Sequence, residues 1–316
     1  MLMRDLKELL SQMSLEEKIG QLVQLPPSCL DGDFITGPAA QMGLTAEDLR
    51  LAGSYLSIVG AERIRAIQAE YIKNHPHHIP LLFMADIING YRTVYPIPLA
   101  QGCTFSPEIV EECAAMAARE AAAAGVQVTF SPMADLVRDA RWGRVMESTG
   151  EDPYLNGVMA AAAVRGYQGK DGALTEKGRI ASCLKHFAGY GAPEGGRDYN
   201  TVELSQRTLR DDYLPAYNEA VKAGCELVMI SFNTLDRVPS SANRKLLKDI
   251  LRNEMGFDGV VISDWAAVAE LMAHGIAEDE TEAASLAIRA GVDIDMATPI
   301  YMKELRKLVE DEIIPE

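Results

Sequence analysis

The chain contains little positive charge and few cysteines. Its 316 residues include 30 Lys and Arg against 46 Asp and Glu, which gives a formal net charge of -16 at pH 7. Nucleic acids and anionic membrane surfaces would repel a protein of this charge, so neither is an expected partner. The five cysteines, Cys29, Cys103, Cys113, Cys183 and Cys225, form no Cys-x-x-Cys pair, and several lie in apolar runs. We therefore expect buried, reduced thiols.

Several sequence motifs are also missing. No apolar run is long enough for a membrane helix, and residues 1–8 alternate charged side chains with Leu instead of forming the apolar core of a signal peptide. These absences predict a cytoplasmic protein. Neither of the phosphate-binding motifs G-x-G-x-x-G and G-x-x-x-x-G-K-[ST] occurs, so nucleotide binding has no support.

A group of histidines, His75, His77 and His78, is the most obvious place to look for a metal site. These residues stand around Pro76, between a predicted helix and a predicted strand. This context favours a plain loop over a metal site. We expect no metal and no organic cofactor.

The sequence does contain a regular alternation of apolar strands and helices. Ser14 and Glu17 form a capping box that begins a helix near the N-terminus. Strands are predicted at 22–25, 56–60, 81–85, 126–130, 180–184, 226–231, 259–263 and 292–296, with helices at 61–73, 107–124, 153–167, 205–223, 243–255, 266–274 and 280–290. This alternation is typical of a parallel α/β sheet.

The distribution of polar residues distinguishes between the two common kinds of parallel sheet. Polar and charged side chains follow nearly every predicted strand instead of gathering at a single switch point. This favours a closed (β/α)8 TIM-like barrel over an open doubly wound sheet. A barrel of this length is ordinary for a single domain, so we expect one domain over residues 1–316.

The most informative candidate for chemistry is Asp264, which ends the apolar run 259–263 and is followed by Trp265. A carboxylate at the tip of a barrel strand, with an indole beside it, suits nucleophilic or general-base work on a sugar ring. A structural role is also open, because an Asp in this place could cap the helix predicted at 266–274.

Further polar residues follow four other predicted strands. They are Asp86 with Asn89 and Arg92, the segment from Asp135 to Arg144, Lys185 with His186, and Ser231 with Asn233. In a barrel these side chains converge on one mouth, as a site for a polyhydroxylated ring requires. Each also suits a different role: the arginines could pair with Asp86 or Glu147, Lys185 could form a Schiff base, and His186 could be a core residue.

Five segments together resemble the successive signatures of glycoside hydrolase family 3, most closely its β-glucosidase branch. They are Asp86 to Arg92, Arg141 to Arg144 running on to Pro153, Lys185 to Phe187, Gly195 to Asp198, and Gly256 to Trp265. Their order and approximate spacing agree across nearly the whole chain. The resemblance implies a retaining hydrolase that acts on terminal β-D-glucosyl residues by double displacement.

The resemblance also implies a role for each matching residue. Asp264 would be the nucleophile that forms a covalent glycosyl ester, and Trp265 would form part of the sugar-binding wall. The remaining residues would hydrogen-bond the hydroxyl groups of the sugar: Asp86, Arg92, Arg144, Lys185 and His186. The general acid of this branch comes from a domain downstream of the barrel, which we expect to be absent from this chain, and none of Glu147, Glu151 and Glu194 matches its position. The isolated chain would then be weakly active, except toward activated aryl glucosides.

Two departures from the family pattern bear on specificity. Phe232 stands where the family often has Tyr, so a hydroxyl contact to the nucleophile is expected to be missing. The stretch 188–200 contains no His, which argues against the N-acetylglucosaminidase branch. Asp86 favours glucose, but the sequence also leaves a β-xylosidase open.

The same residues would also suit a non-catalytic carbohydrate-binding barrel, or a Schiff-base lyase that uses Lys185. The expected partners are a β-glucoside and either the downstream domain or a second copy of the chain in a homo-oligomer.

Overall fold

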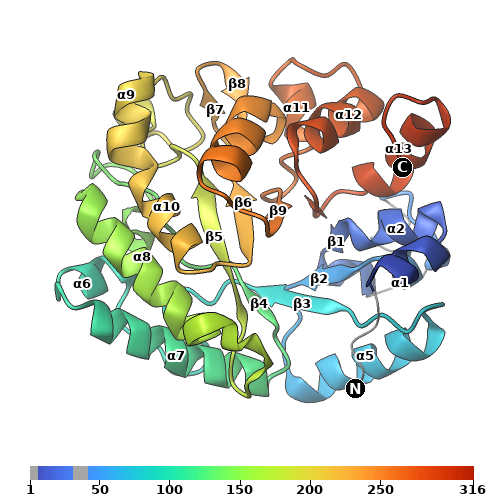
Figure 1. Ribbon diagram of the computed structural model, residues 1–316, viewed down its shortest axis with the longest axis horizontal. Coiled ribbons are helices and arrows are strands. Elements are labelled where there is room, and N and C mark those ends of the chain that lie inside the picture. The colour runs from blue at the N-terminus through green and yellow to red at the C-terminus, as the bar shows by residue number, and fades with distance from the viewer. Residues whose placement is uncertain (1–5, 31–41) are drawn as a thin grey trace.

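The computed structural model describes residues 6–30 and 42–316. Its main sheet contains eight parallel strands: β1 (Val23–Leu25), β2 (Ser54–Leu56), β3 (Leu82–Ala85), β4 (Val128–Thr129), β5 (Ala181–Phe187), β6 (Leu227–Ile230), β9 (Val260–Ile262) and β10 (Asp295–Met296). They pair in the order β10-β1-β2-β3-β4-β5-β6-β9. A parallel bridge between Ile262 and Ile294 joins the two ends of this order. The sheet is therefore a closed barrel surrounded by helices, which confirms the predicted fold class (Figure 1).

The helices occupy most of the segments that the sequence predicts. They include α1 (Leu6–Gln12), α2 (Leu15–Gln21), α4 (Ala46–Leu51), α5 (Ala61–Asn74), α6 (Pro98–Gly102), α7 (Pro107–Ala123), α8 (Pro153–Gln168), α12 (Glu280–Ala290) and α13 (Ile300–Glu310). The capping box before α2 is confirmed, because Ser14 accepts from the Glu17 amide and Glu17 accepts from the Ser14 amide. Proline occupies the first turn of α7 and α8, where its missing N–H costs no helical hydrogen bond.

Three predicted helices differ from the structure. The segment 205–223 divides into α9 (Gln206–Thr208), the π-helical η5 (Leu209–Tyr213) and α10 (Pro215–Lys222), because Pro215 cannot donate a backbone hydrogen bond. The segment predicted at 243–255 forms the π-helical η7 (Lys245–Glu254). After Asp264 the chain makes turns, and only the short helix α11 (Glu270–Ala273) follows.

Two strand predictions were displaced along the chain. β2 lies two residues earlier than predicted, and β5 extends to Phe187, so Lys185 and His186 lie inside the strand and not after it. A small hairpin of β7 (Thr234–Leu235) and β8 (Val238–Pro239) follows β6 outside the barrel sheet.

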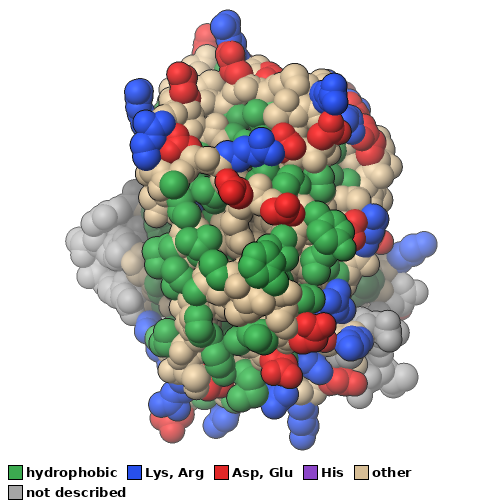
Figure 2. All heavy atoms as spheres, turned by 90° about the vertical axis from the view of Figure 1, so that its left-hand side faces the viewer, with side chains coloured by type: hydrophobic (Ala, Val, Ile, Leu, Met, Phe, Trp, Pro, Cys, Tyr) green, Lys and Arg blue, Asp and Glu red, His purple; other side chains and the backbone are tan. Residues whose placement is uncertain are grey.

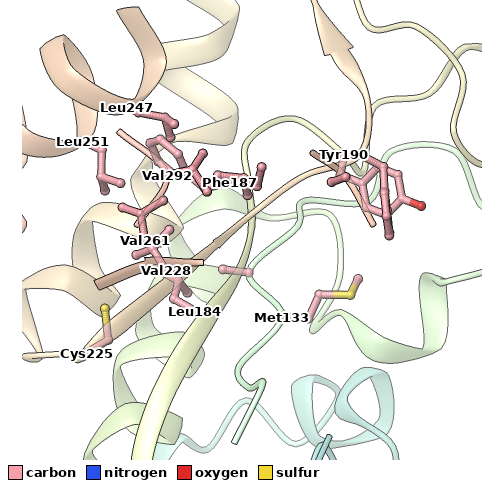
Figure 3. Packing of buried hydrophobic residues seen from close by; sticks show 14 of the residues in the cluster. Met133, Leu184, Phe187, Tyr190, Cys225, Val228, Leu247, Leu251, Val261 and Val292 are labelled. Atoms are coloured by element: carbon pink, nitrogen blue, oxygen red, sulfur yellow. The ribbon is translucent and has the colours of Figure 1, made fainter. Parts of the chain in front are cut away.

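Alternate residues of the strands pack into two separate cores. One cluster consists of side chains from the strands and their ends, such as Met84, Met229 and Ile262, and fills the inside of the barrel. The other lies between the strands and the helices. Figure 3 shows Val228 of β6 and Val261 of β9 in this outer core, together with Leu247 and Leu251 of η7. The same strands thus hold the helices on one side and close the barrel interior on the other.

Small residues let α7 and α8 approach closely. A Cβ atom added to Gly166 of α8 would stand only 2.4 Å from the carbonyl oxygen of Glu111 in α7. This pair of helices lies at the lower left of the barrel in Figure 1. Their alanines serve packing.

The cysteines and histidines can now be placed. All five cysteines are free, and Cys29, Cys183 and Cys225 are buried. Cys113 is only half-buried, and the prediction of burial was wrong for Cys103, which is exposed where the chain leaves α6. His75 and His77 lie in a bend and turn after α5, and His77 Nε2 lies 3.0 Å from Glu17 Oε2. Within residues 6–30 and 42–316, no group of three or more His, Cys, Asp or Glu side chains could hold a metal ion.

The outer surface carries exposed apolar side chains on one side of the barrel. Phe105, just after α6, is 75% exposed, and Tyr154, in the first turn of α8, is 80% exposed. Figure 2 views this side and shows hydrophobic side chains gathered there. Among the described helices, none is both long and apolar enough to cross a membrane. The cytoplasmic location stays a prediction.

Candidate active site

The predicted site residues lie at the carboxyl ends of three strands. Asp86 follows β3, Lys185 and His186 lie within the last three residues of β5, and Asp264 follows β9 two residues after Ile262. All strands of the barrel are parallel, so these ends open on the same mouth. The structure therefore assembles residues that are separated by up to 178 positions in the chain.

Asp86 and Lys185 form an ion pair across this mouth. Lys185 Nζ donates to Asp86 Oδ1 at 2.6 Å. The lysine side chain is 4% exposed, whereas that of Asp86 is 52% exposed. The carboxylate therefore reaches the open mouth while the ammonium group supports it from below. This pairing suits a hydrogen-bonding lysine better than a neutral Schiff-base lysine.

Asp264 is buried, with only 8% of its surface exposed. Its Oδ1 accepts a hydrogen bond from the Trp265 amide at 2.6 Å. Burial raises the pKa of Asp264, and the charges of His186, Lys185 and Arg144 oppose this rise. A helix-capping role fails, because α11 begins at Glu270 with Ala269 in the capping position. Asp264 is thus a buried carboxyl group whose burial is partly offset by the charges of neighbouring basic side chains.

His186 lies between two carboxylates and is almost inaccessible to solvent. Its Nδ1 lies 2.8 Å from Asp135 Oδ2, and its Nε2 lies 3.5 Å from Asp264 Oδ2. The ring is 1% exposed and packs edge-on against Tyr190, with 5.1 Å between the ring centroids. His186 is therefore held beside Asp264, and its predicted contact with a sugar hydroxyl stays a prediction.

Arg144 is organised by a neighbouring acid. Its guanidinium group donates to both oxygens of Glu147, at 2.7 and 2.9 Å, and lies 5.5 Å from the centroid of the Tyr190 ring. This is the pairing with Glu147 that the sequence leaves open. It does not remove Arg144 from the site, because the guanidinium charge also lowers the pKa of Asp264.

Arg92 is the exception among the predicted site residues. No contact within the described part of the chain links it to Asp86, Lys185, His186 or Asp264. Its backbone amide donates to Glu120 Oε2 at 2.8 Å, as does the amide of Thr93 at 2.9 Å. The residue is exposed, and its charge acts on Glu120 of α7. The loop after β3 carries Arg92 toward the outer helices, so its role in sugar binding stays a prediction.

Two exposed aromatic side chains, Trp265 and Tyr199, lie near Asp264, and the sequence predicted only Trp265. Trp265 is 51% exposed beside Asp264. Tyr199 is 54% exposed and lies over Phe232, with ring centroids 4.7 Å apart. Burial and the charge of Asp264 raise the pKa of Tyr199, so its hydroxyl group lies within the field of the predicted nucleophile. The only sequence signal for Tyr199 is its place after the motif that ends at Asp198.

Glu270 is a second carboxyl group near Asp264 that the sequence did not single out. It is half-buried at the start of α11, and its pKa is raised by burial and by the charge of Asp264. Its position six residues after Asp264, in a segment predicted to be helical, gave no sign of this proximity.

The chain matches known proteins along nearly its whole length. Residues 14–316 match the family model described as the glycosyl hydrolase family 3 N terminal domain. The periplasmic beta-glucosidase of Salmonella typhimurium is 38% identical over 305 residues, which cover 96% of this chain and 38% of that protein. A beta-xylosidase of Formosa agariphila is 38% identical over 293 residues, which cover 91% of this chain and 35% of that protein.

A solved structure agrees closely with this fold. The beta-glucosidase of Listeria innocua in complex with glucose superposes with a TM-score of 0.95 at 51% identity, covering 98% of this chain and 44% of that chain. The present chain thus spans less than half the length of each of these proteins.

Proposed function

Because the chain belongs to glycoside hydrolase family 3, we propose that it is the catalytic barrel of a retaining β-glucosidase. The observation that carries this proposal is Asp264, a buried carboxyl group just after a strand, with His186 Nε2 3.5 Å from its Oδ2 and the charges of Lys185 and Arg144 acting on it. Such a carboxylate combines partial desolvation with ionisation, which is what a nucleophile requires. Support also comes from the glucose complex of the Listeria innocua protein.

The proposed reaction has two steps. The Asp264 carboxylate attacks the anomeric carbon, and the bond to the leaving oxygen breaks as the glycosyl ester forms. Water then attacks the same carbon and gives a proton to the conjugate base of the general acid, while the ester bond breaks, glucose is released and the Asp264 carboxylate is regenerated. Asp86, held by Lys185, would accept hydrogen bonds from the sugar hydroxyls, and Trp265 would cover one face of the ring. These contacts would orient the anomeric carbon toward Asp264.

A general acid must protonate the leaving oxygen, and we propose that it comes from outside the barrel. Three described carboxylates among the site residues and their partners are already paired: Asp86 with Lys185, Asp135 with His186, and Glu147 with Arg144. Glu270 is the exception, and its replacement by Gln tests whether it could serve as the acid.

The proposed substrate is a terminal β-glucoside, with a β-xyloside as the second candidate. Relatives with either name match the chain at similar identity. The exposed Asp86 carboxylate favours glucose, because it offers an acceptor for an additional hydroxyl group. Equal use of matched aryl glucosides and xylosides would contradict this preference.

Covalent trapping tests the proposal. The protein is incubated with 2,4-dinitrophenyl 2-deoxy-2-fluoro-β-glucoside, whose good leaving group reduces the need for an acid and whose fluorine slows hydrolysis of the ester. We expect the intact mass to rise by one fluoroglucosyl group and peptide mapping to place it on Asp264. The corresponding fluoroxyloside is the specificity control.

Two results would contradict the proposal. One is a folded protein that binds glucose by calorimetry but never forms an adduct, which would indicate a carbohydrate-binding barrel. The other is borohydride-dependent labelling of Lys185 with a carbonyl substrate, which would indicate a Schiff-base lyase.

A further inference from the structure

Asp135 lies directly behind the candidate site and has almost no contact with solvent. It is 1% exposed. The segment that carries it continues alongside β5, because the Lys185 amide donates to Pro132 O at 3.0 Å and the Ala134 amide donates to Lys185 O at 2.7 Å. Asp135 is therefore fixed in register with the end of β5, opposite His186.

Both oxygens of Asp135 are occupied by donors. Oδ2 accepts from the His186 amide at 3.0 Å and lies 2.8 Å from His186 Nδ1. Oδ1 accepts from the Tyr217 hydroxyl at 2.9 Å, and this hydroxyl also contacts the His186 carbonyl oxygen. A fully buried carboxylate thus holds the backbone and the ring of His186 at the same time.

The other face of His186 meets Asp264. Asp264 Oδ2 is buried and accepts no hydrogen bond within the described part of the chain, and His186 Nε2 stands 3.5 Å from it. Leaving a buried carboxylate oxygen without a partner is costly. A neutral imidazole has a single N–H, whereas the imidazolium form has one on each nitrogen. Only the imidazolium presents donors to both carboxylates.

We propose that Asp135 is a positioning residue, which holds His186 with Nδ1–H toward itself and Nε2–H toward Asp264 and so keeps the Asp264 carboxylate ionised in its buried place. Tyr217 supports the arrangement by fixing Asp135 Oδ1. The inference rests on the proposed function, because it assigns Asp264 the role of nucleophile.

Other charged groups near Asp264 limit how far its ionisation should shift when the contact with His186 is lost. The charges of Lys185 and Arg144 also oppose the rise in the pKa of Asp264, whereas Glu270, Tyr199 and the buried Cys183 thiol are acidic groups whose pKa the charge of Asp264 raises. The Trp265 amide holds Oδ1. His186 itself meets Asp135, Asp264, the edge of the Tyr190 ring and the Tyr217 hydroxyl. Because two cations remain, loss of the His186 contact should shift the ionisation of Asp264 without abolishing it.

Two substitutions, each with a matched control, test the inference. Asp135→Asn keeps the shape and removes the charge, and Asp295→Asn makes the same exchange of side chain at a fully buried aspartate in β10, whose pKa of about 7 keeps it uncharged at acid pH. Tyr217→Phe removes a buried hydroxyl that holds Asp135. Tyr301→Phe removes an equally buried hydroxyl that donates to Val292 O at 2.9 Å.

The readout is the rate of labelling by the fluoroglucoside as a function of pH. Wild-type labelling should slow at acid pH, where Asp264 becomes protonated. The acid limb is the pH range over which labelling slows in this way. Asp135→Asn should move the acid limb upward by about one pH unit, which makes labelling about tenfold slower at acid pH. Tyr217→Phe should move it in the same direction by a few tenths of a unit. Both control variants should keep the wild-type limb, because they change only stability.

A second readout follows the two ring nitrogens of His186 by NMR in protein labelled at histidine, with His186→Gln for assignment among the five histidines. We expect both nitrogens to carry protons at neutral pH in the wild type and only one in Asp135→Asn.

A folded Asp135→Asn with an unchanged acid limb would overturn the inference, as would a wild-type His186 with one protonated nitrogen. If Asp135→Asn fails to fold, Tyr217→Phe decides in the same way. If wild-type protein is never labelled, the proposed function fails, and the NMR result on His186 decides the inference separately.

Discussion

Two buried aspartates on neighbouring strands have opposite surroundings. Asp264 follows β9 at the barrel mouth, and Asp295 lies in β10. The two strands are neighbours, because the Ser263 amide just after β9 donates to Ile294 O just before β10 at 2.8 Å. Asp264 faces His186, Lys185 and Arg144. Asp295 accepts from the neutral Thr298 hydroxyl at 2.7 Å and the Tyr301 amide at 3.2 Å. Burial raises the pKa of Asp295 to about 7.

The depth of burial therefore does not by itself determine the charge of a carboxyl group. Desolvation is the largest influence on both residues and raises the pKa of both. What differs is the charge of the groups that surround them, because neutral donors offset desolvation less than cations do. We therefore expect Asp264 to serve chemistry and Asp295 to serve structure.

The largest effect on this contrast should come from replacing Asp264, the proposed nucleophile. Asp264→Ala should lower kcat/KM for 2,4-dinitrophenyl β-glucoside by about 10⁴-fold, since no other described carboxylate has the same surroundings. Glucose affinity, measured by calorimetry, should change much less. Retention of activity within tenfold of wild type would show that Asp264 is not the nucleophile.

Asp295→Asn should change the pH dependence of stability. The folded-state pKa of about 7 lies above the ordinary value of 3.8, so the folded protein binds the proton more tightly. The protonated Asp295 therefore contributes to the free energy of unfolding. This contribution is fully present below pH 4 and is lost as pH rises through 7, and a pKa shift of this size corresponds to about 4 kcal/mol. Urea unfolding at pH 4 and pH 8 measures it.

In that experiment the free energy of unfolding should fall with rising pH by about 4 kcal/mol more in wild type than in Asp295→Asn. An identical pH dependence in the two proteins would mean that Asp295 is ionised in the folded state. Asp264→Asn provides the comparison, with a smaller change expected because cations offset its burial.

The two tryptophans of the chain sharpen the contrast between the open mouth and the sealed interior. Trp265→Ala should weaken glucose binding about tenfold, because an exposed indole beside Asp264 would lose its contact with the sugar. Trp142 is 1% exposed and donates to Asp198 Oδ1 at 2.9 Å, so Trp142→Phe should lower the melting temperature instead. Equal losses of affinity in the two variants would show that Trp265 makes no specific contact with the sugar.

The smallest effect concerns Glu270. Glu270→Gln removes a negative charge near Asp264, so the acid limb of the labelling rate should move downward by a few tenths of a pH unit. Turnover of alkyl glucosides, which need protonation of the leaving group, should change by less than about threefold. A loss of about 10² or more with these substrates alone would identify Glu270 as the general acid and overturn the proposal that it lies outside the barrel.

Local patterns in the sequence predicted the scaffold well. The apolar run that ends at Asp264 became β9, and the capping box at Ser14 begins α2. Both signals depend on residues within a few positions of one another, because hydrophobic periodicity and capping are local. The same local rules misplaced the helix predicted at 205–223, where Pro215 and π-helical turns interrupt it.

The partners of the site residues could not be predicted in this way. Asp135 meets His186 across 51 positions of sequence, and Asp86 meets Lys185 across 99. These contacts depend on the register between strands and on the direction in which each loop leaves the barrel. The same dependence explains Arg92, whose motif matched the family but whose loop is held by Glu120.

The sequence by itself therefore determined which residues stand at the strand ends, because an alternation of apolar and polar segments is enough to define a parallel barrel and its mouth. Only the tertiary structure decided how those residues are charged and held. Closure of the barrel buries Asp264 against His186 and leaves Asp295 among neutral donors, and such surroundings arise from segments far apart in the chain.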